Sequence, residues 1–262
     1  MRCLIVSCIL ISWALADDVT SAAPAAASGA PECHAAVPCL DTCTSGIPCT
    51  GAMLQKGMAG IEKAHEKKMM EDDVYEFFKN MTESDLDCAA TIINNYCKTG
   101  EHATDRQSFV TLIKELCPSS NLSDYVNSFY QTQVDKVNRI KEQNAQCGEL
   151  LIGWEKSVYK VFDLTSGDKP DMTAVFTQSM QNCVDFITQA EENRDTCEPL
   201  WIQEFPNVVA YYQANHDIII AMVKPMCESG VKNSAKIPEL INKAMQMFMC
   251  KKGAPPATTP AN

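Results

Sequence analysis

Cysteine is the residue type with the clearest chemical potential in this sequence. Four cysteines fall within 17 residues near the N-terminus, with the spacing C-x5-C-x3-C-x5-C. Structural zinc sites usually place two ligands about two to four residues apart and repeat that pair, and only Cys39 and Cys43 have this spacing. We therefore favour disulfides over zinc. We predict a small cysteine-rich knot over residues 33–51, held by its own cross-links or pinned to the body of the protein.

The redox state of these thiols depends on the first 16 residues. Arg2 precedes an apolar run, and the small residues Ala14 and Ala16 stand at the positions that signal peptidase cleavage requires. The run is shorter than the roughly 20 residues that span a bilayer, so we predict a signal peptide over residues 1–16 and a secreted, extracellular protein. Cleavage removes two of the 14 cysteines, and the even number left in an oxidising compartment predicts that all are disulfide-bonded. The remaining cysteines are Cys33, Cys39, Cys43, Cys49, Cys88, Cys97, Cys117, Cys147, Cys183, Cys197, Cys227 and Cys250.

Other reactive side chains do not assemble into a recognisable catalytic or metal-binding motif. The sequence contains no G-x-S-x-G, no H-E-x-x-H and no phosphate-binding glycine loop, and its four histidines are isolated along the chain. The methionine-rich segment Met245–Cys250 resembles a copper(I) site, but methionine more often fills a core. We interpret the acidic run Glu71–Asp73 as solvated surface. We expect a protein that is not an enzyme and that has no metal ion or cofactor.

The charge of the chain excludes several classes of partner. Its net charge is −11 and its pI is about 4.8. Binding to nucleic acid or to an anionic membrane surface needs a basic face that neutralises phosphates. No segment after the signal peptide reaches the length of a membrane span, and the C-terminus has no hydrophobic tail for a lipid anchor. We expect no nucleic-acid partner and no transmembrane anchor.

Two segments with few apolar residues flank the body of the protein. Residues 17–32 are rich in Ala, Ser and Pro, and residues 253–262 are rich in Pro and Thr. Neither segment can bury a core, so we predict a disordered linker and a disordered tail. Two N-x-S/T tripeptides lie within the body, and in a secreted protein they predict N-glycosylation at Asn80 and Asn121.

Residues 52–252 show the sequence punctuation of helices. Thr82–Asp85 and Thr104–Gln107 have the pattern of N-terminal caps, and Gly100 stands where a helix C-terminus is expected. Pro118 ends the run after the second cap. We expect the later prolines at positions 170, 199 and 238 to start helices and Pro225 to kink or end one.

The strongest periodic signal is an apolar seam from Val126 to Val161. Its 11 positions follow one another in steps of four and three residues, and nine of them are apolar or cysteine. This heptad pattern is typical of a coiled coil and predicts one helix about 50 Å long, with Gly148 and Gly153 as its weak points. With the shorter patterns that follow, it predicts an all-α fold. We expect an elongated antiparallel bundle of six or seven helices stapled by disulfides.

Two functional classes remain for such a protein. The first is a secreted interaction protein or matrix component that binds an extracellular protein partner. The alternative is an extracellular carrier of a small apolar ligand in a cavity between helices, for which an enclosed apolar cavity of several hundred Å³ would be the sign. A filled core would favour the interaction protein. The residues expected to line such a cavity are Phe176, Met180, Phe186, Tyr211, Tyr212, Met222 and Phe248.

Overall fold

A computed structural model describes residues 39, 42–163, 171–237 and 239–240. The predicted signal peptide, linker and tail lie outside the described residues, as do Cys33, Phe248 and Cys250. Within the described ranges the chain forms helices and loops and contains no β-strand. The all-α prediction is confirmed.

Ten helices of eight or more residues make up the described body, which exceeds the six or seven predicted. They are α3 (Gly51–Glu66), α4 (Asp72–Lys79), α5 (Glu83–Thr99), α6 (Arg106–Leu116), α7 (Leu122–Gln143), α8 (Ala145–Asp163), α9 (Met172–Glu192), α10 (Arg194–Glu204), α11 (Pro206–Ala214) and α13 (Lys224–Lys232). Four shorter pieces complete the described helices: α2 (Thr42–Ser45), α12 (His216–Ile218), the π-helical turn η2 (Ile219–Val223) and the 3₁₀ turn η3 (Ser234–Lys236).

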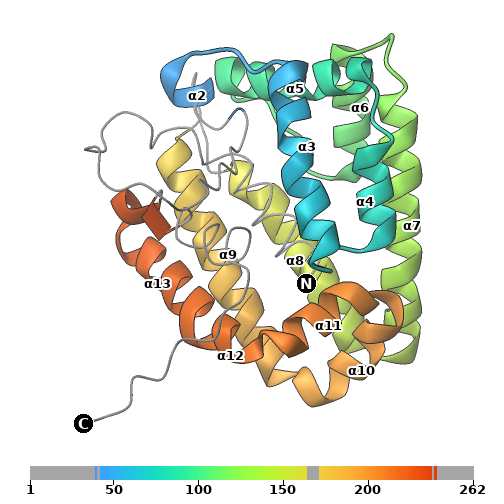
Figure 1. The fold of residues 1–262 in the computed structure, drawn as a ribbon, viewed down its shortest axis with the longest axis vertical. Helices are drawn as coiled ribbons and strands as arrows, with labels where there is room; N and C mark the ends of the chain where they lie inside the picture. The colour runs from blue at the N-terminus through green and yellow to red at the C-terminus, as the bar shows by residue number, and fades with distance from the viewer. Residues whose placement is uncertain (1–38, 40–41, 164–170, 238, 241–262) are drawn as a thin grey trace, which may run out of the picture.

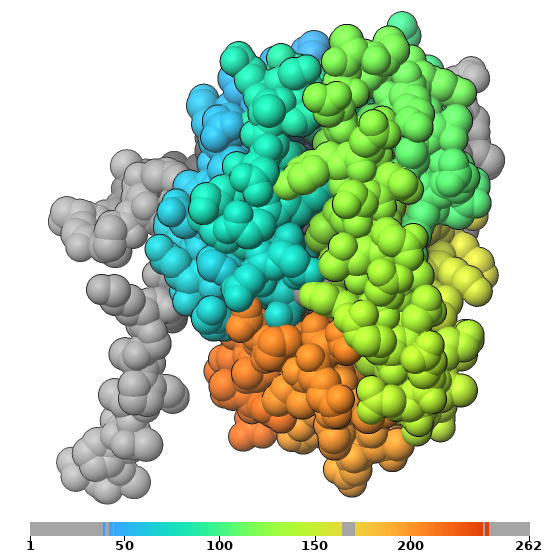
Figure 2. Space-filling view, turned by 90° about the vertical axis from the view of Figure 1, so that its right-hand side faces the viewer, coloured from blue at the N-terminus to red at the C-terminus, as the bar shows by residue number. Residues whose placement is uncertain are grey.

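Two groups of helices stand side by side along the long axis of the molecule (Figure 1). α3, α4 and α7 form one group, α9 and α13 form the other, and α8 lies between them. α5 and α6 cover one end, and α10 and α11 cover the other. α7 packs on α6 and α8, α8 packs on α9, and α9 packs on α13. Seen from the side of α7, the orange α10–α11 pair lies below the blue-green N-terminal helices and beside the lower part of the green α7 (Figure 2).

Local signals account for the ends of α5 and α6. Thr82 caps α5 in a reciprocal capping box with Asp85, and Gly100 ends α5 with φ of +72°, both as predicted. α6 begins one residue later than predicted, because Asp105 is its cap in place of Thr104. α6 ends at Leu116, before Pro118, as expected.

The predicted long coiled-coil helix is wrong, because the chain leaves the helical conformation at Asn144. There φ is −152° and ψ is 110°, and α7 and α8 fold back against each other. The side-chain oxygen of Asn144 accepts a hydrogen bond from the backbone N of Cys147 at 3.2 Å, which helps to start α8. Gly148 allows this sharp reversal, since a Cβ there would lie 2.4 Å from Cβ of Lys141. The prediction that the seam positions face the core is nevertheless confirmed, because none of the 11 residues is exposed.

Prolines shape the C-terminal half differently from the prediction. Pro199 lies inside α10, and Pro206 begins α11. Near Pro225 the chain stays helical but becomes π-helical over Ile219–Val223 before α13 begins. Proline has no N–H to donate to the carbonyl one turn earlier, and a wider π turn changes which donors reach that carbonyl. The other two prolines predicted to start helices, at 170 and 238, lie outside the described residues.

Four disulfides cross-link the described residues. Cys88–Cys117 joins α5 to the end of α6, and Cys147–Cys197 joins α8 to α10. The segment predicted as a knot has one internal bridge, Cys39–Cys49, and one bridge to α5, Cys43–Cys97. Cys183 and Cys227 are buried in one hydrophobic cluster between α9 and α13. That Cys33, Cys183, Cys227 and Cys250 are disulfide-bonded stays a prediction.

Candidate functional site

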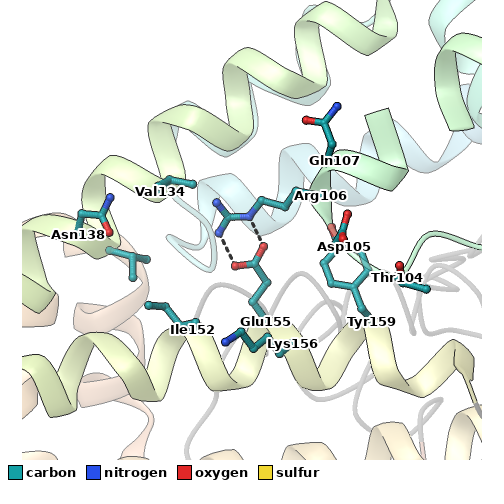
Figure 3. A pocket seen from close by; sticks show the side chains of 11 residues that line it. Thr104, Asp105, Arg106, Gln107, Val134, Asn138, Ile152, Glu155, Lys156 and Tyr159 are labelled. Carbon is teal, nitrogen blue, oxygen red and sulfur yellow. Dashed lines mark hydrogen bonds and ion pairs between the residues drawn. The ribbon is translucent and has the colours of Figure 1, made fainter. Parts of the chain in front are cut away.

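A groove lies between α6, α7 and α8 on the described surface (Figure 3). Its volume is about 440 Å³. Val134 and Val137 on α7 and Ile152 on α8 give it apolar walls, and Tyr159 closes one end. Arg106, the first residue of α6, reaches into the groove from above α8. The groove is therefore built by three helices that follow one another along the chain.

An ion pair between Arg106 and Glu155 crosses the floor of this groove. Nε and Nη2 of Arg106 donate to the two carboxylate oxygens of Glu155, a bidentate arrangement that joins α6 to α8. The two side chains are only 29% and 25% exposed. The guanidinium also lies 5.8 Å from the ring centroid of Tyr130, within reach of a cation–π contact. The hydrogen bonds to Glu155 raise the pKa of Arg106, so the guanidinium keeps its proton.

The lining of the groove combines apolar walls with polar and charged side chains. Its described lining contains no histidine, cysteine or serine. The guanidinium of Arg106 cannot act as a base because it keeps its proton, and Glu155 already accepts two hydrogen bonds from it. The groove is therefore a trench with apolar walls and the paired Arg106 and Glu155, and its other polar lining residues are Thr104, Asp105, Gln107, Asn138 and Lys156. Such a trench accepts an apolar group of a small molecule or of another protein's side chain.

The residues predicted to line an interior cavity do not come together. Met180 and Phe176 belong to a cluster between α9 and α13. Phe186 and Tyr212 belong to a second cluster, and Tyr211 packs against a third. Met222 is exposed at the surface, and Phe248 lies outside the described residues. The other five side chains thus pack in separate parts of the described core.

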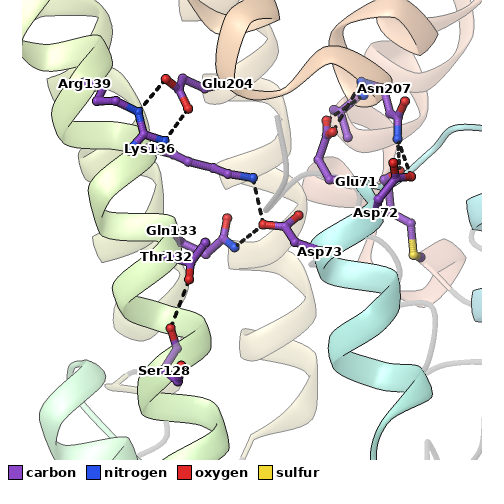
Figure 4. A network of polar contacts seen from close by, with 12 residues as sticks. Glu71, Asp72, Asp73, Ser128, Thr132, Gln133, Lys136, Arg139, Glu204 and Asn207 are labelled. Atoms are coloured by element: carbon purple, nitrogen blue, oxygen red, sulfur yellow. Dashed lines mark hydrogen bonds and ion pairs between the residues drawn. The ribbon is translucent and has the colours of Figure 1, made fainter.

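A polar network joins the N-termini of α4 and α11 (Figure 4). Glu71 precedes α4 and is only 4% exposed, so its interpretation as solvated surface is wrong. Its carboxylate accepts hydrogen bonds from the backbone N of Val208 at 3.0 Å and of Asn207 at 3.4 Å, and so caps α11 from a distance. The side-chain amide of Asn207 donates in return to Asp72 at 3.0 Å and to the carbonyl of Met70 at 3.3 Å. The two helix ends therefore lock each other.

Two cations on α7 extend this network to neighbouring helices (Figure 4). Lys136 donates to Asp73 on α4 at 2.7 Å. Arg139 donates to both carboxylate oxygens of Glu204 on α10, at 2.7 Å each. The outer acids of α4 and α10 are thus held by α7, which gives this network an architectural role.

Each described histidine pairs with a carboxylate. Nε2 of His65 lies 2.9 Å from Asp72, Nε2 of His102 lies 3.0 Å from Asp163, and Nε2 of His216 lies 2.8 Å from Glu191. The hydrogen bond to Glu191 raises the pKa of His216 and favours the imidazolium. These pairs join α3 to α4, the loop after α5 to α8, and α12 to α9. No sequence signal showed these pairs, because the two members of each lie on different elements, 7, 61 and 25 residues apart.

Other predicted sites have a plain structural setting. Asn80 and Asn121 are exposed at helix boundaries, so both acceptors can carry a glycan, and glycosylation itself stays a prediction. Within the described residues, no group of three or more His, Cys, Asp or Glu is placed to hold a metal ion. None of the described helices combines the length and the apolar character needed to cross a bilayer.

Comparison of the chain with known protein families, with curated proteins and with solved structures gives no match.

Proposed function

We propose that this chain is a secreted, non-enzymatic protein that acts by binding another extracellular protein through its surface. Two features support an extracellular location: the predicted signal peptide and the disulfides that cross-link the helical body. In this proposal the helices form a disulfide-stapled bundle with residues 33–51 as its cysteine-rich knot. Such a frame resists unfolding outside the cell.

One observation supports surface recognition above all. The aromatic and methionine side chains that a carrier would need around one cavity are divided among separate, filled clusters. Among the described residues, these side chains pack into different clusters, so they stabilise the fold and do not line one shared space. We therefore infer that the protein binds its partner through its outer surface.

Native mass spectrometry of the unreduced protein from its own secretion tests this proposal. We expect a stable complex whose added mass is that of a second protein. The matched control is the same protein after reduction and alkylation, which should lose the partner because the cross-linked frame is gone. A chain that carries only a lipid-sized mass, or that carries nothing, contradicts the proposal.

The groove between α6, α7 and α8 favours a second candidate, the carrier of a small apolar ligand. The groove has the volume and apolar walls of a ligand site, but at residues other than those predicted. Binding of the apolar dye ANS tests it: Ile152→Trp should fill the groove and reduce dye binding, whereas Ile47→Trp, at an exposed isoleucine outside the groove, should not. Equal dye binding by the two variants contradicts a ligand site in the groove.

A further inference from the structure

An apolar helix face lies exposed where α12 passes through the π-helical turn into α13. The six consecutive apolar residues from Ile218 to Val223 include none that is buried. Ile218 and Met222 are 41% and 38% exposed, and Ile47 is the other large hydrophobic residue in the described ranges with comparable exposure. An exposed apolar cluster on a soluble protein usually marks an interaction site.

The exposed positions follow one side of the helical path. We call this the α12–α13 face and define it by five exposed residues: Ala214, Ile218, Ala221, Met222 and Pro225. Apart from the adjacent pair Ala221 and Met222, they recur every three or four residues, as the positions of one helix face do.

The opposite side of the same path is occupied. Ile219, Ile220 and Val223 pack on the cluster between α9 and α13. The α12–α13 face is therefore an outer surface, with small alanines that let another backbone come close.

Opposite charges stand at the two ends of the apolar run. The side chain of Asp217 is fully exposed before the run, and Lys224 follows it directly. In a two-fold symmetric contact, residue i of one copy meets residue j of the other and the reverse holds too. When two copies pack antiparallel about an axis between Ile220 and Ala221, each Asp217 comes to the Lys224 of the other copy. The face is thus complementary to itself in charge as well as in apolar character.

We propose that this chain forms a homodimer through the α12–α13 face, closed at each end by an ion pair between Asp217 of one copy and Lys224 of the other. This inference goes beyond the proposed function, because it concerns a second copy of the chain and leaves open what else the dimer binds. A single helix face buries less than the roughly 800 Å² per partner of a standard interface, so the dimer is reversible and depends on concentration. The net charge of −11 on each copy opposes association, and salt at about 0.15 M screens that repulsion beyond about 8 Å.

Sedimentation velocity of the full secreted chain, with its disulfides intact, tests the homodimer. We expect a monomer–dimer equilibrium between about 1 μM and 1 mM. Lys224→Asp places two acids at each end of the contact and should weaken the dimer by at least about tenfold. Asp217→Lys should do the same, although it also removes a contact of 3.3 Å with Nδ1 of His216. The double variant Asp217→Lys/Lys224→Asp restores opposite charges and should regain most of the affinity.

Apolar variants give the second arm of the test. Ile218→Ser with Met222→Ser should abolish the dimer, and Ile47→Ser, which removes an equally exposed isoleucine elsewhere, should leave it unchanged. Far-UV circular dichroism shows that each variant keeps its helices. A wild type that stays monomeric up to about 1 mM overturns the proposal. So does a dimer that survives both single charge reversals, or a double charge swap that associates no better than they do.

Discussion

Removal of the Glu71 side chain should destabilise the protein more than removal of any exposed acid. Its carboxylate is almost completely buried and accepts hydrogen bonds from two backbone N–H groups at the start of α11. Because this side chain turns toward α11, it makes no capping hydrogen bond to its own helix, α4. The residue therefore links two helix ends that are separated by more than 130 positions in the sequence.

The magnitude follows from these contacts. A hydrogen bond to a charged group contributes about 1.5–3 kcal/mol, and the contact with Val208 at 3.0 Å is of this kind. The contact with Asn207 at 3.4 Å is long and adds less. Loss of a helix cap costs about 0.5–2 kcal/mol and overlaps with these contributions. We expect Glu71→Ala to lower the free energy of unfolding by about 2–4 kcal/mol, and Glu71→Gln, which keeps an acceptor oxygen, by about 1 kcal/mol.

Urea unfolding at pH 7, followed by far-UV circular dichroism with the disulfides intact, measures this difference. The matched control is Glu62→Ala, which removes an exposed acid from the neighbouring α3 and should change stability by less than about 0.5 kcal/mol. If Glu71→Ala is no more destabilising than Glu62→Ala, the buried cap contributes nothing and the reasoning fails. If Glu71→Gln costs as much as Glu71→Ala, the charge matters and the hydrogen-bond acceptor does not.

Two further predictions concern α8 and the histidine beside α9. Gly148→Ala should lower the free energy of unfolding by about 1–3 kcal/mol, because the new Cβ would lie 2.4 Å from Cβ of Lys141. Gly153→Ala has open space around its Cβ and should stabilise the protein by about 0.5–1 kcal/mol. Equal urea midpoints for the two variants would contradict this prediction. The pKa of His216 is raised by its hydrogen bond to Glu191, so its contribution to stability is fully present below about pH 6.5 and is lost as the pH rises through the raised pKa. The stability difference between the wild type and His216→Gln should therefore shrink from pH 6 to pH 9, and a difference that grows over this range would refute the assignment.

The sequence predicted the faces of the helices better than their ends. Thr82 and Gly100 carry their signals in neighbouring residues, so the cap and the stop of α5 could be read directly. The break at Asn144 could not be read, because the steps of four and three residues run through it without a change of phase. Both arms of the hairpin present the same face to the core, and a periodic pattern therefore fits one helix or two equally well. The close approach of Gly148 to Lys141 distinguishes them, and that contact exists only after folding.

The polar contacts that join helices were outside the reach of sequence reasoning for a related reason. Asp73 and Lys136 are 63 residues apart, and Arg139 and Glu204 are 65 residues apart. A run of acids such as Glu71–Asp73 has the same composition whether it is solvated or caps a distant helix. Its burial depends on where α11 packs, which no local pattern specifies.

The groove was missed because it lies mostly beside the seam, which contributes only Val137 to the described lining. Among the residues that line it, Ile152, Glu155 and Tyr159 each directly follow a seam position on α8, and Val134 follows one on α7. These flanking positions are half-buried in an antiparallel pair and become a hollow only where the next helix covers them incompletely. Here α6 covers them with its first turn, and Arg106 from that turn pairs with Glu155. A seam therefore indicates what a helix pair buries, while the third helix determines what the pair leaves open for a ligand.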